Sequence, residues 1–453
     1  MPTHRSTNPL RRAAPVFSAA ALMLAQGALA ARPASAAPTA PVGQRVTLLD
    51  ISLKSEPVTL VRIDPGSQGR APQVLFVDSR GERRTRPMDQ ILALAPASWS
   101  EPAASATGDP DEGRRATRFL ELVDGQRFAG EFDLPGLPTA TGSSAKTDDA
   151  NVLWRSSQLG PVRVPLEQVA RMVGDADRLA GALQRPLSTV TDTVILASGD
   201  RVEGLVEVLG PEIEIDQPNK GAGSTHARTS IPADQAILVS LVNPTKPLGG
   251  AAVWLSDGSV VATDRLGFES DTGKVNLRAR LGSSESGRVL LDAADVEAVA
   301  PEASRLFPLA GLPIASQLLA PERPTGTPAQ VEDSPSGSPL GAAAISLPGP
   351  MTVEWTLPTG ARAVIGAAAL DERSYVWGDC TITVSVVAPG DKTAERVVAR
   401  GRLRAESPVL ALNTPLTEAK PGDRLRVSIS AGDRGPVQDR VILRRMLIVT
   451  GAP

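Results

Sequence analysis

Residues 122–130 read Leu-Val-Asp-Gly-Gln-Arg-Phe-Ala-Gly: a short apolar stretch, an Asp-Gly turn, and a second stretch that ends in glycine. The same pattern returns at 196–204 and, in a shorter form, at 255–261. An Asp-Gly or Ser-Gly pair between two alternating stretches is typical of a β-hairpin. Because the hairpin recurs, we predict that the middle of the chain consists of tandem β units.

A second motif closes each unit. Pro-x-Asp/Glu-Gln occurs at 87–90, 165–168 and 232–235, and a degenerate copy begins at Asp292. The first unit lacks the glycine turn but carries this closing motif. The pattern predicts five short strands per unit, with a proline-led turn before the last one. Such a unit is typical of a small SH3-like β-barrel, and a flat antiparallel sheet shared between units is the alternative. We place the four units at 43–96, 115–174, 190–242 and 250–300.

The composition agrees with an all-β protein and excludes several functions. The 453 residues include 40 glycines and 40 prolines, which helix interiors tolerate poorly. The formal net charge is -3, from 47 basic and 50 acidic residues, so no nucleic-acid partner is expected. One cysteine and two histidines exclude an intrachain disulfide and a His/Cys metal cluster. We therefore predict no metal site and no cofactor.

The first residues are predicted to be an export signal. Arg5, Arg11 and Arg12 precede an apolar stretch at about 13–31, and Ala-x-Ala sites follow at 28–30 and 34–36. This order describes a secretory signal peptide, which we assign to residues 1–36. No later segment has 18 consecutive apolar residues, so no membrane span is expected after cleavage. The predicted location is periplasmic, cell-surface or extracellular, in a bacterium.

The last part of the chain is predicted to be a separate β-sandwich at 341–453. Residues 301–340 are rich in proline and read as a linker, or as an extended segment wrapped on a neighbour. After them, alternating stretches such as 351–357, 381–387 and 424–429 are separated by turn residues. About eight antiparallel strands at this spacing indicate a sandwich or jelly roll.

The ordered features of this domain resemble the NPCBM family of carbohydrate-binding modules. The matching positions are Leu357-Pro358, Ile365-Gly366 through Leu370-Asp371-Glu372, Gly378 before Ile382-Thr383-Val384, Leu425-Arg426-Val427, and Gly432 through Gln438-Asp439. The resemblance implies a galactose-binding-like β-sandwich that binds sugars, often galactose-containing glycans. Residues 343–346 and 439–443 lack the histidine and the tryptophan that the family commonly has there.

A sugar site needs an apolar platform for the ring and a few polar groups for its hydroxyls. The aromatic residues predicted on a loop of this domain are Tyr375 and Trp377, and charged residues lie beside them. The candidate ligand-binding residues are Tyr375, Trp377, Asp371, Glu372, Arg373 and Asp379. Two alternatives remain: Trp377 and Tyr375 cover the sandwich core, or the carboxylates hold Ca²⁺.

We expect no enzyme activity, because no segment is left for a catalytic domain and the chain has no phosphate-binding loop or nucleophile elbow. The predicted function is that of an exported multidomain binding protein. Its sandwich binds glycans or polysaccharides, and its repeats act as a spacer or scaffold. The alternative is a structural or protein-interaction role in the cell envelope, with envelope proteins as partners and no sugar binding.

Overall fold

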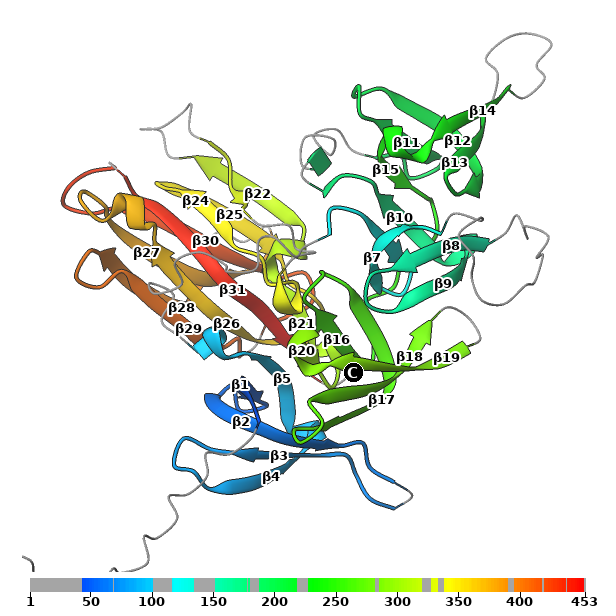
Figure 1. The fold of residues 1–453 in the computed structure, drawn as a ribbon. Coiled ribbons are helices and arrows are strands. Elements are labelled where there is room, and N and C mark those ends of the chain that lie inside the picture. Colours follow the sequence, from blue (N-terminus) through cyan, green and yellow to red (C-terminus); the bar gives the residue numbers. More distant parts are fainter. Residues whose placement is uncertain are drawn as a thin grey trace, which may run out of the picture. The chain divides into compact units, whose positions relative to one another are not determined.

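The structure is a computed structural model in which residues 41–453 form one compact unit. It describes residues 43–67, 69–100, 116–133, 151–176, 178–179, 187–217, 227–281, 285–319, 327–332, 338–389, 395–417, 419–436 and 438–451. The predicted signal peptide at 1–36 lies outside the described residues. In the described part the fold is all-β, with antiparallel strands joined by short 3₁₀ turns (Figure 1). None of the helices described there is long and apolar enough to cross a membrane.

Twenty strands form four sets of five. The first set comprises β1 (Gln44–Asp50), β2 (Ser55–Asp64), β3 (Gln73–Val77), β4 (Arg83–Pro87) and β5 (Ile91–Pro96). The second comprises β6 (Phe119–Leu122), β7 (Arg127–Phe132), β8 (Asn151–Ser156), β9 (Gly160–Pro165) and β10 (Val169–Val173). The third comprises β11 (Asp192–Leu196), β12 (Arg201–Leu209), β13 (Glu212–Gln217), β14 (Ala227–Pro232) and β15 (Ala236–Ser240). The fourth comprises β16 (Ala251–Leu255), β17 (Val260–Glu269), β18 (Lys274–Leu281), β19 (Glu285–Asp292) and β20 (Val296–Ala300).

All four sets share one pairing pattern. The first strand of each set pairs with its second and fifth strands, and the second, third and fourth strands pair in succession. The closing motif forms a 3₁₀ turn before the fifth strand each time: η1 (Met88–Gln90), η3 (Leu166–Gln168), η4 (Ala233–Gln235) and η5 (Ala293–Asp295). Closure of each set into an SH3-like barrel stays a prediction.

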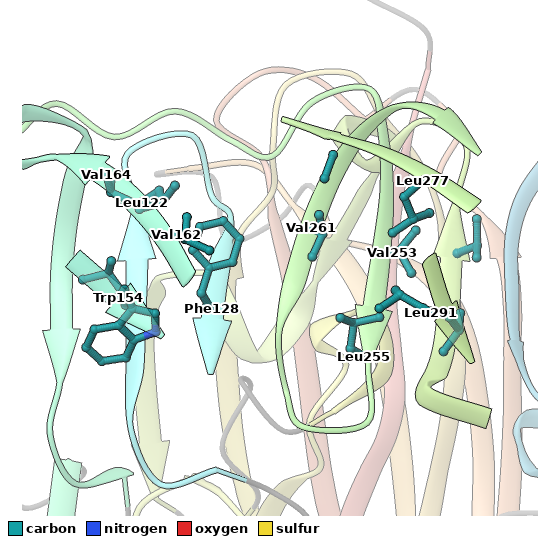
Figure 2. Packing of buried hydrophobic residues seen from close by; sticks show 14 of the residues in the cluster. Leu122, Phe128, Trp154, Val162, Val164, Val253, Leu255, Val261, Leu277 and Leu291 are labelled. Atoms are coloured by element: carbon teal, nitrogen blue, oxygen red, sulfur yellow. The ribbon is translucent and has the colours of Figure 1, made fainter. Parts of the chain in front are cut away.

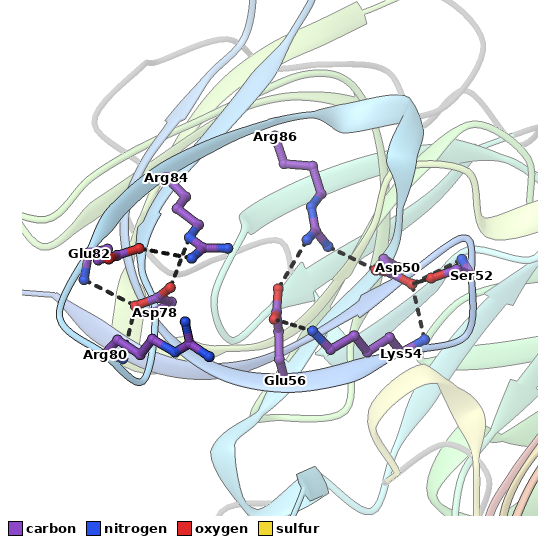
Figure 3. Close-up of polar contacts among 9 residues, drawn as sticks. All are labelled: Asp50, Ser52, Lys54, Glu56, Asp78, Arg80, Glu82, Arg84 and Arg86. Atoms are coloured by element: carbon purple, nitrogen blue, oxygen red, sulfur yellow. Dashed lines mark hydrogen bonds and ion pairs between the residues drawn. The ribbon is translucent and has the colours of Figure 1, made fainter.

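The first hairpin shows how a turn forms where the repeated glycine is missing. In the turn between the first two strands, Gly125 of the second set adopts φ 83°. Leu53 occupies the equivalent position in the first set and adopts φ 67°. The Asp50 carboxylate supports the turn by accepting hydrogen bonds from the backbone N–H groups of Ser52 (2.9 Å) and Lys54 (3.0 Å). Arg86 on β4 pairs with Asp50 (3.1 Å) and Glu56 (3.1 Å), as Figure 3 shows. These contacts hold a residue other than glycine in the left-handed region.

Two junctions between sets run through their last strands, and β17 also pairs with β2 and β7. β10 and β15 pair around Met172 and Val239, and β5 and β20 pair at Leu94 and Val299. Each of these four residues is the fourth residue of its strand. Both junctions therefore use the same part of the fifth strand of each set. Apolar side chains fill the interior of the sets. Figure 2 shows Leu122, Phe128, Trp154, Val162 and Val164 in the second set and Val253, Leu255, Val261, Leu277 and Leu291 in the fourth.

The C-terminal part is a sandwich of two antiparallel sheets around a separate core (Figure 1). One sheet contains, in order, β23 (Gln330–Val331), β24 (Ile345–Pro348), β31 (Arg440–Thr450), β26 (Ala361–Leu370) and β29 (Val409–Pro415), with β21 (Leu306–Pro308) also paired to β31. The other contains β22 (Ile314–Leu319), β25 (Met351–Thr356), β30 (Arg424–Ala431), β27 (Asp379–Val387) and β28 (Glu395–Arg404).

The structure differs from the linker predicted at 301–340. Strands β21, β22 and β23 of this segment pair with strands of the sandwich, and Leu309 is fully buried in its core. The three strands therefore lie against the sandwich, as the wrapped alternative of the sequence analysis expects, and the sandwich begins before residue 341. Edge strands such as these are stabilised by backbone hydrogen bonds and need few apolar side chains, so their sequence looks like a spacer.

Candidate functional site

Five of the six predicted site residues lie on the loop between β26 and β27, and Asp379 is the first residue of β27. The turn η10 (Glu372–Ser374) starts the loop, and Asp371 caps that turn by accepting a hydrogen bond from the Arg373 backbone N–H (3.0 Å). Asp371 is buried, and its carboxylate pairs with Arg440 at 3.5 Å. The first carboxylate of the predicted set therefore holds the loop to β31 and does not face solvent.

Asp379 fixes the other end of the loop. It is buried, and it accepts hydrogen bonds from Arg402 Nε (2.6 Å) and Nη2 (2.5 Å) and from the backbone N–H of Asp433 (3.0 Å). The Arg402 guanidinium holds the pKa of the Asp379 carboxyl below its ordinary value. Arg402 also bonds the Asp433 carboxylate (2.6 Å). This second carboxylate ties the loop to β28 and to the turn at 432–435.

Tyr375 and Trp377 have different surroundings. Tyr375 is half-buried and packs against the sandwich core. Burial, with a smaller contribution from Glu372, raises the pKa of its phenol. Trp377 is 58% exposed, and its neighbour Val376 is exposed as well. Of the two aromatic residues predicted on the loop, only Trp377 presents a broad apolar surface to solvent.

The polar groups that remain at the surface come from two segments. Glu372 and Arg373 are exposed on the loop itself. Asp433 and Arg434 lie on the adjacent turn, where Arg434 Nη1 donates a hydrogen bond to the Val376 carbonyl (3.2 Å). Residues 432–436 have the glycine and proline content of a turn, so Asp433 and Arg434 were not among the predicted site residues. The one sequence feature that could have pointed to them is the stretch from Gly432 to Asp439, which resembles the NPCBM family.

No metal centre is found among the described residues, since no group of three His, Cys, Asp or Glu side chains there is placed to hold an ion. Asp371 and Asp379 are both paired with arginines. The arrangement can offer an indole ring, a valine side chain and a few exposed charged groups to a ligand.

Comparison with known proteins gives distant structural similarity alone. No family model matches the sequence, and no curated protein matches it. Several of the similar structures contain carbohydrate-binding modules. A family 51 module (CBM51) from a Clostridium perfringens GH95 protein, solved with methyl-galactose, is 12% identical over 32% of this chain and 99% of its own, with a TM-score of 0.24.

Two multidomain structures are similar to the same degree. The tandem CBM51 modules of a Streptococcus pneumoniae family 98 glycoside hydrolase are 9% identical over 90% of this chain and 88% of theirs, with a TM-score of 0.25. A second CBM51 module of Clostridium perfringens ZmpB with its INT domains, solved with GlcNAc, is 10% identical over 42% of this chain, with a TM-score of 0.25. This chain spans 44% of that protein's chain. Nothing about this chain's ligand follows from similarities this distant.

Proposed function

We propose that this chain is an exported, non-catalytic binding protein whose C-terminal sandwich binds a glycan at the loop between β26 and β27. The observation that carries the proposal is the exposure of Trp377, 58% of whose surface is open to solvent. Trp154 and Trp355 are fully buried, as expected for the largest apolar side chain. An exposed indole offers a flat apolar surface on which the C–H face of a sugar ring can pack.

The loop is held rigid before any ligand arrives. Asp371 is paired with Arg440, and Asp379 is paired with Arg402, so both ends of the loop are tied to strands. Because the loop is fixed, little conformational entropy is lost when a ligand packs on Trp377. The two carboxylates thus position the platform, and ligand hydroxyls would be met by exposed groups beside it.

Four exposed charged side chains lie on the same loop as Trp377 or on the adjacent turn: Glu372, Arg373, Asp433 and Arg434. A sugar hydroxyl both donates and accepts hydrogen bonds. Carboxylates can accept from it and guanidinium groups can donate to it. The NPCBM resemblance of the sequence leads us to propose a galactose-containing glycan as the ligand class.

The four five-stranded sets have a different role in this proposal. We propose that they are SH3-like units forming a scaffold that presents the sandwich outside the cytoplasm. Their shared pairing pattern and their repeated edge-to-edge junctions support a scaffold. The predicted signal peptide supports export.

The proposal is tested by titrating the full-length mature chain with lactose and longer galactosides while tryptophan emission is recorded. Stacking of a sugar on Trp377 changes the environment of an exposed indole, so a saturable change is expected. The variant Trp377→Ala should abolish it, while Val397→Ala, which trims another exposed side chain of the sandwich, should leave it unchanged. A saturable change that persists in Trp377→Ala would place binding elsewhere.

A protein-interaction role is the second candidate, and two observations favour it. Two of the predicted carboxylates are already engaged by arginines, and Val376 beside Trp377 enlarges the exposed apolar surface. Exposed apolar patches also mark protein contacts. A folded chain that binds no sugar in any assay would support this role.

A further inference from the structure

A groove lies between the second and third sets of strands. It encloses about 820 Å³, within the range of ligand-binding clefts. One wall is η3 of the second set, and the others come from the third set and its flanking residues. The lining residues are Leu166, Glu167, Val190, Thr191, Asp192, Gly204, Leu205, Val206, Glu207, Asp216, Leu241, Val242 and Asn243.

The groove exposes more apolar surface than the fold requires. Val190 is 83% exposed, Leu205 is 61% exposed, and Val242 is 42% exposed. Single exposed apolar residues are ordinary on protein surfaces, but a contiguous group in a concave site marks a contact surface. These three side chains therefore offer an apolar floor for a ligand.

The described residues that line the groove carry acidic side chains, and the guanidinium of Arg228 pairs with one of them from outside the lining. Each ionisable residue of the lining is acidic: Glu167, Asp192, Glu207 and Asp216. Asp192 is engaged in the fold, since its carboxylate accepts from the backbone N–H groups of Val206 (2.9 Å) and Val242 (2.8 Å). Glu207 pairs with Arg228, which does not line the groove. The groove thus complements a ligand that carries positive charge beside apolar groups.

The walls of the groove are fixed in place. The Asn243 side chain donates hydrogen bonds to the carbonyls of Leu166 (3.1 Å) and Val169 (2.7 Å), which links the end of the third set to the second. Strands β10 and β15 pair across the same junction. A site that is formed in advance binds with less loss of entropy than one that must close.

We propose that this groove docks a segment of a partner protein in which apolar residues alternate with lysine or arginine. Among the described residues that line the groove none is aromatic, so they offer a sugar ring no stacking platform. A basic, apolar peptide satisfies both the exposed side chains and the acidic rim. The proposal is independent of glycan binding at Trp377.

The test is fluorescence anisotropy with the full-length mature chain and a labelled heptapeptide of alternating lysine and leucine. A peptide with glutamate in place of lysine tests the charge, and one with serine in place of leucine tests the apolar contact. We expect saturable binding of the lysine–leucine peptide and at least about 10-fold weaker binding of both others. Equal binding of the glutamate peptide would overturn the proposal.

Variants then locate the site. Leu205→Ser should weaken binding by about 10-fold or more, because it removes a leucine that the peptide would cover. Leu290→Ser is the matched control, since Leu290 is 65% exposed on β19 and lies outside the lining, and it should bind normally. Glu167→Gln combined with Glu207→Gln should weaken binding and reduce its salt dependence. Binding unchanged in Leu205→Ser would overturn the proposal.

Sedimentation velocity of the same proteins separates a partner from a second copy of the chain. We expect the unliganded wild type and Leu205→Ser to have the same oligomeric state. A dimer that becomes a monomer in Leu205→Ser would show that another copy occupies the groove, and would contradict a separate basic partner. Trp377→Ala should bind the peptide as the wild type does.

Discussion

Replacing Leu309 by alanine should destabilise the C-terminal sandwich by about 2–5 kcal/mol. Leu309 is fully buried in the sandwich core although it belongs to the segment whose sequence reads as a linker. It follows β21, whose Leu306, Phe307 and Pro308 pair with β31. The substitution removes a buried isobutyl group and leaves a cavity that the fixed strands around it fill only in part.

Hydrogen exchange measured by mass spectrometry is the suitable assay, because a chain of several units need not unfold in one step. Amides of β31 that exchange only through unfolding of the sandwich should exchange faster in Leu309→Ala. Each 1.4 kcal/mol is a factor of ten, so the expected acceleration is from about 30-fold to several thousand-fold.

Leu318→Ala is the matched control. Leu318 lies on β22 in the same segment but is exposed, so its truncation should change the free energy of unfolding by less than about 0.5 kcal/mol. If the β31 amides exchanged equally fast in the wild type and in Leu309→Ala, Leu309 would not belong to the sandwich core, and the pairing of β21 with β31 would be contradicted.

Three further substitutions or treatments have defined outcomes. Asp379→Asn should lower the melting temperature of the sandwich at neutral pH, because it removes the carboxylate that pairs with Arg402. Arg402 lowers the pKa of Asp379, so the extra stability of the wild type is fully present above the ordinary pKa of 3.8 and is lost as the pH falls through the lowered pKa. Melting curves recorded across the acid range would show this loss. Gly130→Ala should cost more than about 1 kcal/mol in denaturant unfolding, since Gly130 adopts φ 152° and an added Cβ would strike the Arg155 carbonyl. Cys380 should resist iodoacetamide at pH 8 until the protein is unfolded, because burial raises the pKa of its thiol to about 12; rapid alkylation of the folded chain, seen by mass spectrometry, would contradict this.

Local turn chemistry explains why much of the strand pattern could be predicted. An Asp-Gly turn forces a hairpin whatever surrounds it, and the proline-led motif ends one strand and starts the next within five residues. The 3₁₀ turns η1, η3, η4 and η5 all lie at this motif. Which edges join different sets is not a local property. The pairing of Met172 with Val239 depends on two distant strands meeting in register, and no residue in either strand specifies that partner.

The wrapped segment and the candidate site were harder to predict for a related reason. Strands β21, β22 and β23 form because each pairs with a strand of the sandwich, and their own residues do not show a strand pattern. Asp371 and Asp379 look like exposed loop acids in the sequence, and they are buried because Arg440 and Arg402 arrive from strands far along the chain. Exposure of Trp377 could not be deduced from its neighbours, since Tyr375 lies two residues away and packs inward.

The most direct test of glycan binding at the Trp377 loop is a glycan-array screen of the full-length mature protein beside Trp377→Ala and Val397→Ala. Selective binding of galactose-containing glycans by the wild type and by Val397→Ala, lost in Trp377→Ala, is the result that we predict. Absence of binding to every glycan by a folded wild-type chain, or equal binding by Trp377→Ala, would contradict a sugar site at this loop.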